Sequence, residues 1–260
     1  MKHRVKTLAL LPLLTVALLL IGLMAPLTAS AASRASSKHI SVPAQHFSSP
    51  PVFVNNSSTN SNNWAGYATS NGHFTKVSAK WTQPTVTCGS TNTYSVFWVG
   101  LDGFKSSTVE QTGSAGFCQG GSPVYFAWYE VFPKQPIIEI KKPVLPGDAL
   151  SASATAVTSS SFKLVISDST QGWTFKTTQT LSGAALSSAE VIAEAPSNQS
   201  GILPLANFGT VNFSSSMVNG KSIGSFSPTE IVMVTSGGTV KAQPSALSGG
   251  TAFSVTWKHS

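Results

Sequence analysis

Short runs of β-branched and aromatic residues recur from residue 59 to the end of this chain, and Gly, Pro, Asn and Ser separate them. No stretch in this part spaces its apolar residues three or four apart, so strands are the regular element that the pattern favours. Roughly a dozen strands are expected, and no unit of fixed length repeats, which disfavours propellers and solenoids. The sequence therefore predicts an all-β fold, a two-sheet antiparallel sandwich, with a closed barrel as the alternative.

The first pair of strands is the clearest local prediction. Asn63–Ser70 and Phe74–Trp81 both have the composition of strands. Asn71-Gly72 between them suits a two-residue hairpin turn, because both residues accept a positive φ, and the two strands are therefore expected to pair. In the aromatic segment Val124–Pro133, strict alternation predicts one face that carries Phe126, Trp128, Glu130 and Phe132.

The beginning of the chain predicts export. Residues 1–31 combine Lys and Arg, a long apolar run and the small residues Ala29-Ser30-Ala31, which together are typical of a cleaved secretory signal peptide. A retained membrane anchor is the alternative, because the apolar run is close to the ~18 residues that span a bilayer. The cleavage-site residues, and the lack of a basic cluster after the run, favour cleavage. A secreted, extracellular protein without stable membrane association is expected.

Residues 32–58 are rich in Ser, Ala, Pro and Asn and show no periodicity, so they are expected to be a pro-segment or a flexible linker. Residues 59–260 are long enough for one sizeable core and are expected to form a single domain. Cys88 and Cys118 both lie in this domain. In an exported protein a disulfide between them is the default, with two free thiols as the alternative.

The charge of the predicted domain is small. The whole chain has 16 Lys and Arg against nine Asp and Glu, a net charge of +7. Five of the basic residues precede residue 59, so the domain keeps 11 lysines, no arginine and all nine carboxylates, a net charge of +2. A protein that binds nucleic acid is expected to cluster its basic residues and to use arginine for bidentate contacts. Nucleic acid is therefore not expected as a partner.

Ionisable side chains are scarce enough to exclude several kinds of chemistry. Of the five histidines only His73 and His259 lie in the domain, and both are expected at the surface, because one follows a turn and the other is the penultimate residue. Without a suitable histidine, neither a Ser-His-Asp triad nor a Cys-His pair is expected. No ligand spacing typical of zinc and no Gly-rich phosphate loop occurs, so no metal and no cofactor is implied.

The remaining reactive groups are carboxylates and amides. Surface charge is expected for the acidic residues at strand ends, beside lysines or in polar runs, namely Glu110, Glu139, Asp148, Asp168 and Glu230. The other four lie in apolar or aromatic stretches, where a carboxylate is either hydrogen-bonded for structure or functional, namely Asp102, Glu130, Glu190 and Glu194. Alternation places Glu190 and Glu194 on one strand face, and spacing alone does not say which of them reacts.

Five motifs follow one another along the domain: Asn63-Trp64-x-Gly66, Trp98-Val-Gly-Leu-Asp-Gly103, Gln111-Thr-Gly113, Trp128-Tyr-Glu-Val-Phe-Pro133 and Ala189-Glu-x-Ile-x-Glu194. In these motifs and their order, the chain resembles the glutamic peptidases, also called eqolisins, from Asn63 to Trp257. The resemblance implies a concanavalin-like or lectin-like β-sandwich with a catalytic dyad, Gln111 and Glu194. It gives Glu190 a supporting role. It also implies that the other motif side chains line or support a substrate cleft, namely Trp64, Trp98, Asp102, Trp128, Glu130 and Phe132.

The resemblance also implies how the dyad would act. Glu194 would take a proton from the attacking water and later give it to the leaving nitrogen, while Gln111 would hold the water and stabilise the oxyanion. Since a glutamate ordinarily titrates near pH ~4.3, an acid optimum is expected. The resemblance and the predicted export together imply a secreted acid endopeptidase. It is expected to act as a monomer on protein or peptide substrates. Val191 stands where family members often have an aromatic residue, and the cysteine pattern is poorer than in the fungal members. Neither departure removes the dyad.

The residues leave two other functions open. A non-catalytic, carbohydrate-binding lectin-like module would use the aromatic side chains to stack on sugars. A glycoside hydrolase would use two carboxylates across an aromatic cleft, but its mechanism does not need Gln111. Hydrolysis of protein substrates, as against sugar binding without hydrolysis, distinguishes the peptidase from both.

Overall fold

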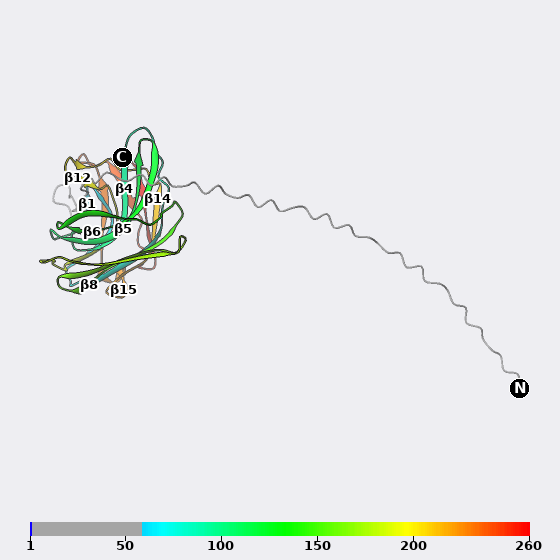
Figure 1. Cartoon of the computed structure of the whole chain (residues 1–260), viewed down its shortest axis with the longest axis horizontal. Coiled ribbons are helices and arrows are strands. Elements are labelled where there is room, and N and C mark those ends of the chain that lie inside the picture. The colour runs from blue at the N-terminus through cyan, green and yellow to red at the C-terminus, as the bar shows by residue number, and fades with distance from the viewer. Residues whose placement is uncertain (2–58) are drawn as a thin grey trace. The chain divides into compact units, whose positions relative to one another are not determined.

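The computed structural model describes residues 59–260 together with Met1. The predicted signal peptide beyond Met1 and the predicted pro-segment or linker at residues 32–58 lie outside the described residues. Residues 59–260 form 18 strands and one short 3₁₀ turn, Ile223–Phe226, and contain no α-helix (Figure 1). No helix in this described part is long and apolar enough to cross a membrane. The prediction of an all-β fold is confirmed.

Six strands form the sheet that carries the candidate site, and we call it the site sheet. Its hydrogen-bonded neighbours are all antiparallel. In spatial order the strands are β2 (Trp64–Ser70), β11 (Ser188–Glu194), β4 (Thr93–Leu101), β5 (Val109–Gln119), β6 (Ser122–Phe132) and β7 (Gln135–Ile140). Strands from distant parts of the sequence therefore lie side by side, most notably β11 between β2 and β4.

Seven strands form the second sheet, which we call the opposite sheet. Its neighbours are also antiparallel. In spatial order the strands are β10 (Trp173–Thr180), β9 (Ser161–Asp168), β8 (Ala149–Thr158), β3 (Lys76–Thr82), β14 (Thr210–Val218), β18 (Phe253–Trp257) and β17 (Val240–Pro244). The remaining short strands are β1 (Asn60–Ser61), β12 (Ser197–Asn198), β13 (Gly201–Ile202) and β15 (Lys221–Ser222).

One strand, β16 (Thr229–Val234), joins the two sheets at one edge. Its first half, Thr229–Ile231, pairs with β2, and its second half, Met233 and Val234, pairs with β17, with a register shift between the last two positions. The hydrogen-bond ladder is therefore continuous from one layer of the sandwich to the other. This continuity was not predicted, since a strand that belongs to two sheets has the same local pattern as any other strand.

Aromatic side chains from both sheets fill the space between the layers. Phe97 packs edge-on against Phe208, and Tyr129 of β6 stacks on Phe175 of β10. Trp81 of β3 donates a hydrogen bond of 2.9 Å from Nε1 to the Ser114 hydroxyl on β5, so its polar group is satisfied across the core. Burial of such side chains contributes about 1.5–3 kcal/mol each and holds the two layers together.

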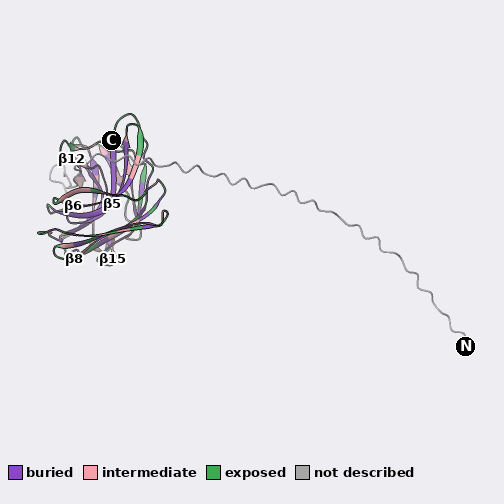
Figure 2. Ribbon diagram, in the orientation of Figure 1, coloured by how far each residue is buried: buried purple, intermediate pink, exposed green. Residues whose placement is uncertain are grey.

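A second apolar cluster covers the other face of the site sheet. It includes Trp64, Trp98, Trp128, Phe117 and Ile192, all of which are fully buried. Strands β4, β5 and β11 are thus buried on both faces, and β5 is purple over most of its length in Figure 2. This double burial explains why most residues of these strands are apolar or small and none is a lysine.

The predicted hairpin at Asn71-Gly72 is wrong. Strands β2 and β3 do not pair: β2 lies in the site sheet and β3 in the opposite sheet. Asn71 does adopt a left-handed conformation with φ 64°, but the chain then crosses between the layers instead of folding back. Phe74 enters the core after this turn, and its amide donates to the carbonyl of Leu186. Burial of Phe74 therefore outweighs the local turn preference.

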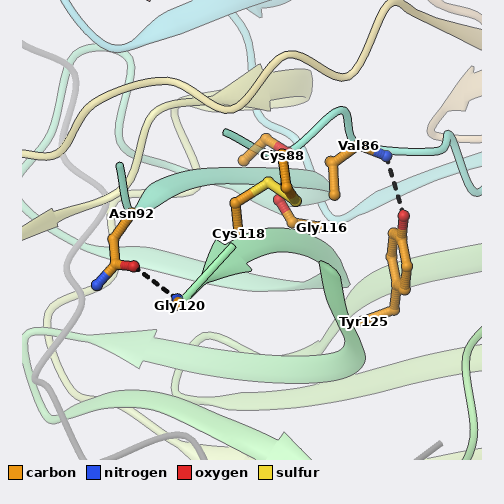
Figure 3. The surroundings of a disulfide bond; sticks show 8 residues. Val86, Cys88, Asn92, Gly116, Cys118, Gly120 and Tyr125 are labelled. Atoms are coloured by element: carbon orange, nitrogen blue, oxygen red, sulfur yellow. Dashed lines mark hydrogen bonds between the residues drawn. A yellow bond between two sulfur atoms is a disulfide. The ribbon is translucent and has the colours of Figure 1, made fainter. Parts of the chain in front are cut away.

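Cys88 and Cys118 form a disulfide across 30 positions of the chain (Figure 3). Two hydrogen bonds of 2.9 Å flank it: the Val86 amide donates to the Tyr125 hydroxyl, and the Gly120 amide donates to the side-chain oxygen of Asn92. The bridge ties the segment before β4 to strand β5. A closed loop of this length contributes about 3–4 kcal/mol to stability in the chain-entropy account.

The prediction of surface charge is wrong for Asp148 and Asp168, which are both buried beside each other where β8 and β9 meet. Asp168 accepts hydrogen bonds from the amides of Thr170 and Gln171, and Asp148 accepts one from the Gln171 side chain. Burial, together with the neighbouring Asp148, raises the pKa of Asp168 to about 6. Their turn-like sequence context gave no sign that the loop would fold over them.

Candidate active site

Gln111 and Glu194 lie on the same face of the site sheet. Gln111 of β5 is opposite Gly100 of β4, and Gly100 is opposite Glu190 of β11. Glu194 is four residues further along β11, an even number, so its side chain points to the same face as Glu190 and Gln111. Trp98 of β4 lies between Gln111 and Glu194 in the register. It pairs with Ile192 of β11 on one side and with Gly113 of β5 on the other.

The carboxylate of Glu194 accepts hydrogen bonds on both of its oxygens. Trp98 Nε1 donates to Oε2 at 2.8 Å, and Asn63 Nδ2 donates to Oε1 at 3.3 Å. The amide of Asn63 is itself oriented, because the Ser61 hydroxyl donates to its oxygen at 3.0 Å. N–H donors of this kind orient a carboxylate and stabilise its charged form. Asn63 was not predicted as a site residue, although it stands first in one of the five motifs.

The amide of Gln111 is oriented by Glu130. Its Nε2 donates to Glu130 Oε2 at 2.6 Å, from the directly opposite position on β6. A carboxylate only accepts, so this contact determines which end of the amide faces Glu130. The oxygen Oε1 of Gln111 is buried and has no hydrogen-bond partner among the described residues. This oxygen is therefore an acceptor that no described side chain uses.

Two glycines make room for this arrangement. A Cβ atom on Gly100 would lie 2.8 Å from the ring of Trp98 and 3.1 Å from Cβ of Gln111. A Cβ atom on Gly113 would lie 2.1 Å from the carbonyl oxygen of Phe97, which no real contact allows. The indole of Trp98 consequently reaches over Gly100 toward Gln111, and a larger residue at either position would displace it.

The aromatic residues predicted for the cleft form one group. Trp64 packs edge-on against Trp98, with ring centroids 4.9 Å apart. Trp128 belongs to the same buried cluster, and the partly exposed Phe132 packs against it. The structure thus brings together Trp64, Trp98, Trp128, Phe132, Glu130, Gln111 and Glu194 on one face, as alternation along the strands predicted for several of them.

Asp102 does not join that group. Its carboxylate accepts hydrogen bonds from the amides of Leu186 at 2.7 Å and Ser187 at 2.8 Å, and from the Ser187 hydroxyl at 3.1 Å. Asp102 has a left-handed φ of 66° and ties the end of β4 to the loop that leads into β11. It supports the site by positioning the strand that carries Glu190 and Glu194.

Two further carboxyl groups are buried near Asp102. Burial raises the pKa of Glu190 well above its usual range; Ser188 partly opposes the shift, and the charges of Asp102 and Glu110 add to it. Burial, followed by the charge of Asp102, raises the pKa of Glu110 to about 9. The prediction that Glu110 is a surface charge is therefore wrong. The raised pKa values favour the protonated, neutral form of both side chains.

Glu110 lies on the opposite face from Gln111. It is paired with Leu101 of β4 and Val131 of β6, whose side chains belong to the core between the layers. Among the described residues no group of three or more His, Cys, Asp or Glu side chains could hold a metal ion. His73 and His259 are both exposed, as predicted.

The fold is that of a class of β-sandwich peptidases of known structure. The structure matches the crystal structure of scytalido-glutamic peptidase with a transition state analog inhibitor at a TM-score of 0.66, with 24% identity, covering 76% of this chain and 98% of that one. It also matches SCP-B, a member of the Eqolisin family in complex with the tripeptide Ala-Ile-His, at a TM-score of 0.62 with 24% identity and the same coverage. These likenesses show the fold.

The sequence is also similar to that of Aspergillopepsin-2 from Aspergillus niger, with 29% identity over 226 residues, which cover 74% of this chain and 79% of that protein. The sequence model of the Peptidase A4 family matches residues 62–257. The chain belongs to the Peptidase A4 family, the glutamic peptidases, and the resemblance inferred from the five motifs is confirmed. A peptidase is thereby favoured over the carbohydrate-binding module and the glycoside hydrolase.

Proposed function

We propose that this protein is a secreted acid endopeptidase in which Glu194 and Gln111 together hydrolyse peptide bonds. The observation that carries the proposal is that the two side chains are anchored separately on one sheet face. Glu194 is fixed by Trp98 and Asn63, and Gln111 is fixed by Glu130 with its oxygen Oε1 left as an acceptor. A carboxylate and an amide oriented in advance are suited to activate a water and to stabilise developing charge.

In this proposal Glu194 is the general base and then the general acid. A water held between the two side chains attacks the scissile carbonyl carbon, and as the new carbon–oxygen bond forms, Glu194 takes one proton from the water. When the carbon–nitrogen bond breaks, Glu194 gives that proton to the leaving nitrogen. The Trp98 and Asn63 donors keep the carboxylate aimed at the water through both steps.

Gln111 has two tasks in this mechanism. Its oxygen Oε1 accepts a hydrogen bond from the attacking water and orients it. Its NH₂ group has two N–H donors, of which one is used by Glu130, and the other is available to the oxyanion that develops on the substrate. The substrate carbonyl would lie between Gln111 and Glu194, over the indole of Trp98.

The reaction is expected to be fast in acid and slow near neutral pH. A glutamate ordinarily titrates near pH ~4.3, so a carboxyl group that first takes and then gives a proton is expected to work best in acid. The predicted signal peptide supports export, which gives such an enzyme access to an acidic exterior. Unfolded or extended polypeptides are the proposed substrates.

The test is hydrolysis of a denatured protein substrate by the purified secreted chain, compared with its Glu194→Gln variant. Loss of the general base is expected to lower the rate by at least about a hundredfold, while the far-UV circular dichroism spectrum is retained. Glu139→Gln, which changes a partly exposed glutamate paired with Lys141, is the matched control and is expected to keep full activity. Wild-type rates in a folded Glu194→Gln variant would refute the assignment.

A further inference from the structure

The outer face of the opposite sheet has an unusual composition. On strands β3, β8 and β9 the inward residues are mostly apolar and buried, and on β10 they are half-buried apart from the buried Trp173. The outward residues of these four strands are mostly serine, threonine and lysine. We call this surface the lysine–hydroxyl face. Its outward residues are Lys76, Ser78, Lys80, Ser151, Ser153, Thr155, Lys163, Val165, Ser167, Thr174, Lys176 and Thr178.

Strand register arranges these side chains in rows. Lys76 is opposite Thr155, which is opposite Lys163. In the next row Lys176 of β10 is opposite Val165 of β9. Lys80 begins the third row, which continues through serines on β8 and β9. Neighbouring strands are about 4.8 Å apart, so ammonium groups and hydroxyl groups repeat at regular short intervals across the face.

The face is positively charged and uncompensated. Lys76, Lys80, Lys163 and Lys176 are exposed, and none of them makes an ion pair with a carboxylate within residues 59–260. The carboxylates nearest in sequence, Asp148 and Asp168, are buried and accept hydrogen bonds from their own loop. Four of the 11 lysines of the domain therefore stand on a surface without an acidic residue, although the domain as a whole is nearly neutral.

The face is also hollowed. A shallow groove of about 330 Å³ runs over β3, β8, β9 and β14, and it includes Lys76, Lys80, Ser78, Ser151, Ser153 and Ser167 in its lining. Ser215 and Met217 line one side of the groove, where the register of β14 shifts between Ser214 and Met217. Serine hydroxyls both donate and accept hydrogen bonds, so the floor of the groove can bind a ligand that itself carries many hydroxyl groups.

We propose that the lysine–hydroxyl face binds an anionic polysaccharide and thereby tethers the enzyme to it. Charge complementarity requires a partner with repeated negative groups, and the rows of hydroxyls match the hydroxyls of sugar rings. Nucleic acid fits less well, because the face has no aromatic side chain for bases to stack on and the described residues contain no arginine. The binding face lies on the opposite sheet, so it is separate from the proposed catalytic residues.

Dextran sulfate is the probe, and neutral dextran of equal length is its control. The variant replaces Lys76, Lys80, Lys163 and Lys176 by glutamine, and the matched control variant replaces Lys141, Lys142, Lys221 and Lys258 by glutamine, so that both lose the same charge. An exposed charge pair changes affinity by a factor of about two, so the first variant is expected to bind dextran sulfate about tenfold more weakly, and the control variant about as well as the wild type.

The proposal would be overturned if the wild type did not bind dextran sulfate at low salt, or if it bound single-stranded DNA more tightly than dextran sulfate. It would also be overturned if the first variant kept the wild-type affinity, or if the two variants lost affinity equally. Circular dichroism shows whether each variant is folded. Rates on a short soluble peptide are expected to be the same in all three proteins, because the face contributes nothing to the reaction. Binding is measured without reference to catalysis, so its outcome does not depend on the proposed mechanism.

Discussion

The burial of Glu110 leads to a prediction about the pH dependence of stability. A paired carboxylate usually stabilises the fold more as the pH rises, whereas Glu110 is expected to stabilise it less. Its pKa in the folded protein is about 9, whereas its ordinary value is 4.5. Between these two pH values the unfolded chain has lost the proton and the folded protein has kept it. Folding stability contributed by this group is therefore complete below about pH 4.5 and decreases as the pH rises toward 9.

The size of the effect follows from the same two values. One pKa unit corresponds to about 1.4 kcal/mol, so at pH 7 the cost of keeping Glu110 protonated is about 3 kcal/mol, and near pH 9 it is about 6 kcal/mol. Glu110→Gln replaces the neutral acid by a neutral amide of similar shape. The variant is expected to match the wild type at about pH 3 and to be more stable by about 3 kcal/mol at about pH 7.

Urea unfolding followed by tryptophan fluorescence measures this difference at each pH, with Glu139→Gln as the surface control. The reasoning about a buried, protonated Glu110 fails if the variant is less stable than the wild type at neutral pH, or if the difference between them is the same at both pH values. A change in Glu139→Gln as large as that in Glu110→Gln would also contradict it, because that glutamate lies in a surface ion pair.

Three other outcomes follow from the structure. Trp98→Phe removes the donor to Glu194 and is expected to lower kcat about tenfold or more, measured on a short peptide, with the fold retained. Reduction of Cys88–Cys118 is expected to lower the free energy of unfolding by about 3–4 kcal/mol, measured by urea titration with and without reductant. Gly113→Ala places a Cβ atom 2.1 Å from a carbonyl oxygen of β4, so it is expected to yield an unstable, inactive protein, seen as loss of the cooperative thermal transition.

Alternation within single strands could be read from the sequence, because a strand's period of two is a local property. It placed Trp128, Glu130 and Phe132 on one face of β6, and Glu190 with Glu194 on one face of β11, and the structure has these arrangements. The family motifs then selected Gln111 and Glu194 among the candidate side chains. Neither step depended on knowing which strands are neighbours.

Strand order and burial could not be read in the same way. Asn63 contacts Glu194, which is 131 positions away, and Asp102 accepts a hydrogen bond from the Leu186 amide, 84 positions away. No local sequence pattern predicts either contact. Glu110 looked like a surface residue because its neighbours in sequence are mixed. Its burial is decided by the opposite sheet, which packs against that face of β5. The Asn71-Gly72 turn failed for a related reason, since tertiary packing of Phe74 overrode a local preference.

The central claim is that Glu194 and Gln111 act as one unit on the same water, and a double-mutant cycle tests it most directly. Rates on a short peptide at acidic pH are compared for the wild type, Glu194→Gln, Gln111→Ala and the double variant, each shown to be folded. If the two residues serve one step, each single variant loses at least about a hundredfold and the double variant loses little more. Losses that multiply, or a Gln111→Ala variant with the wild-type rate, would contradict the account.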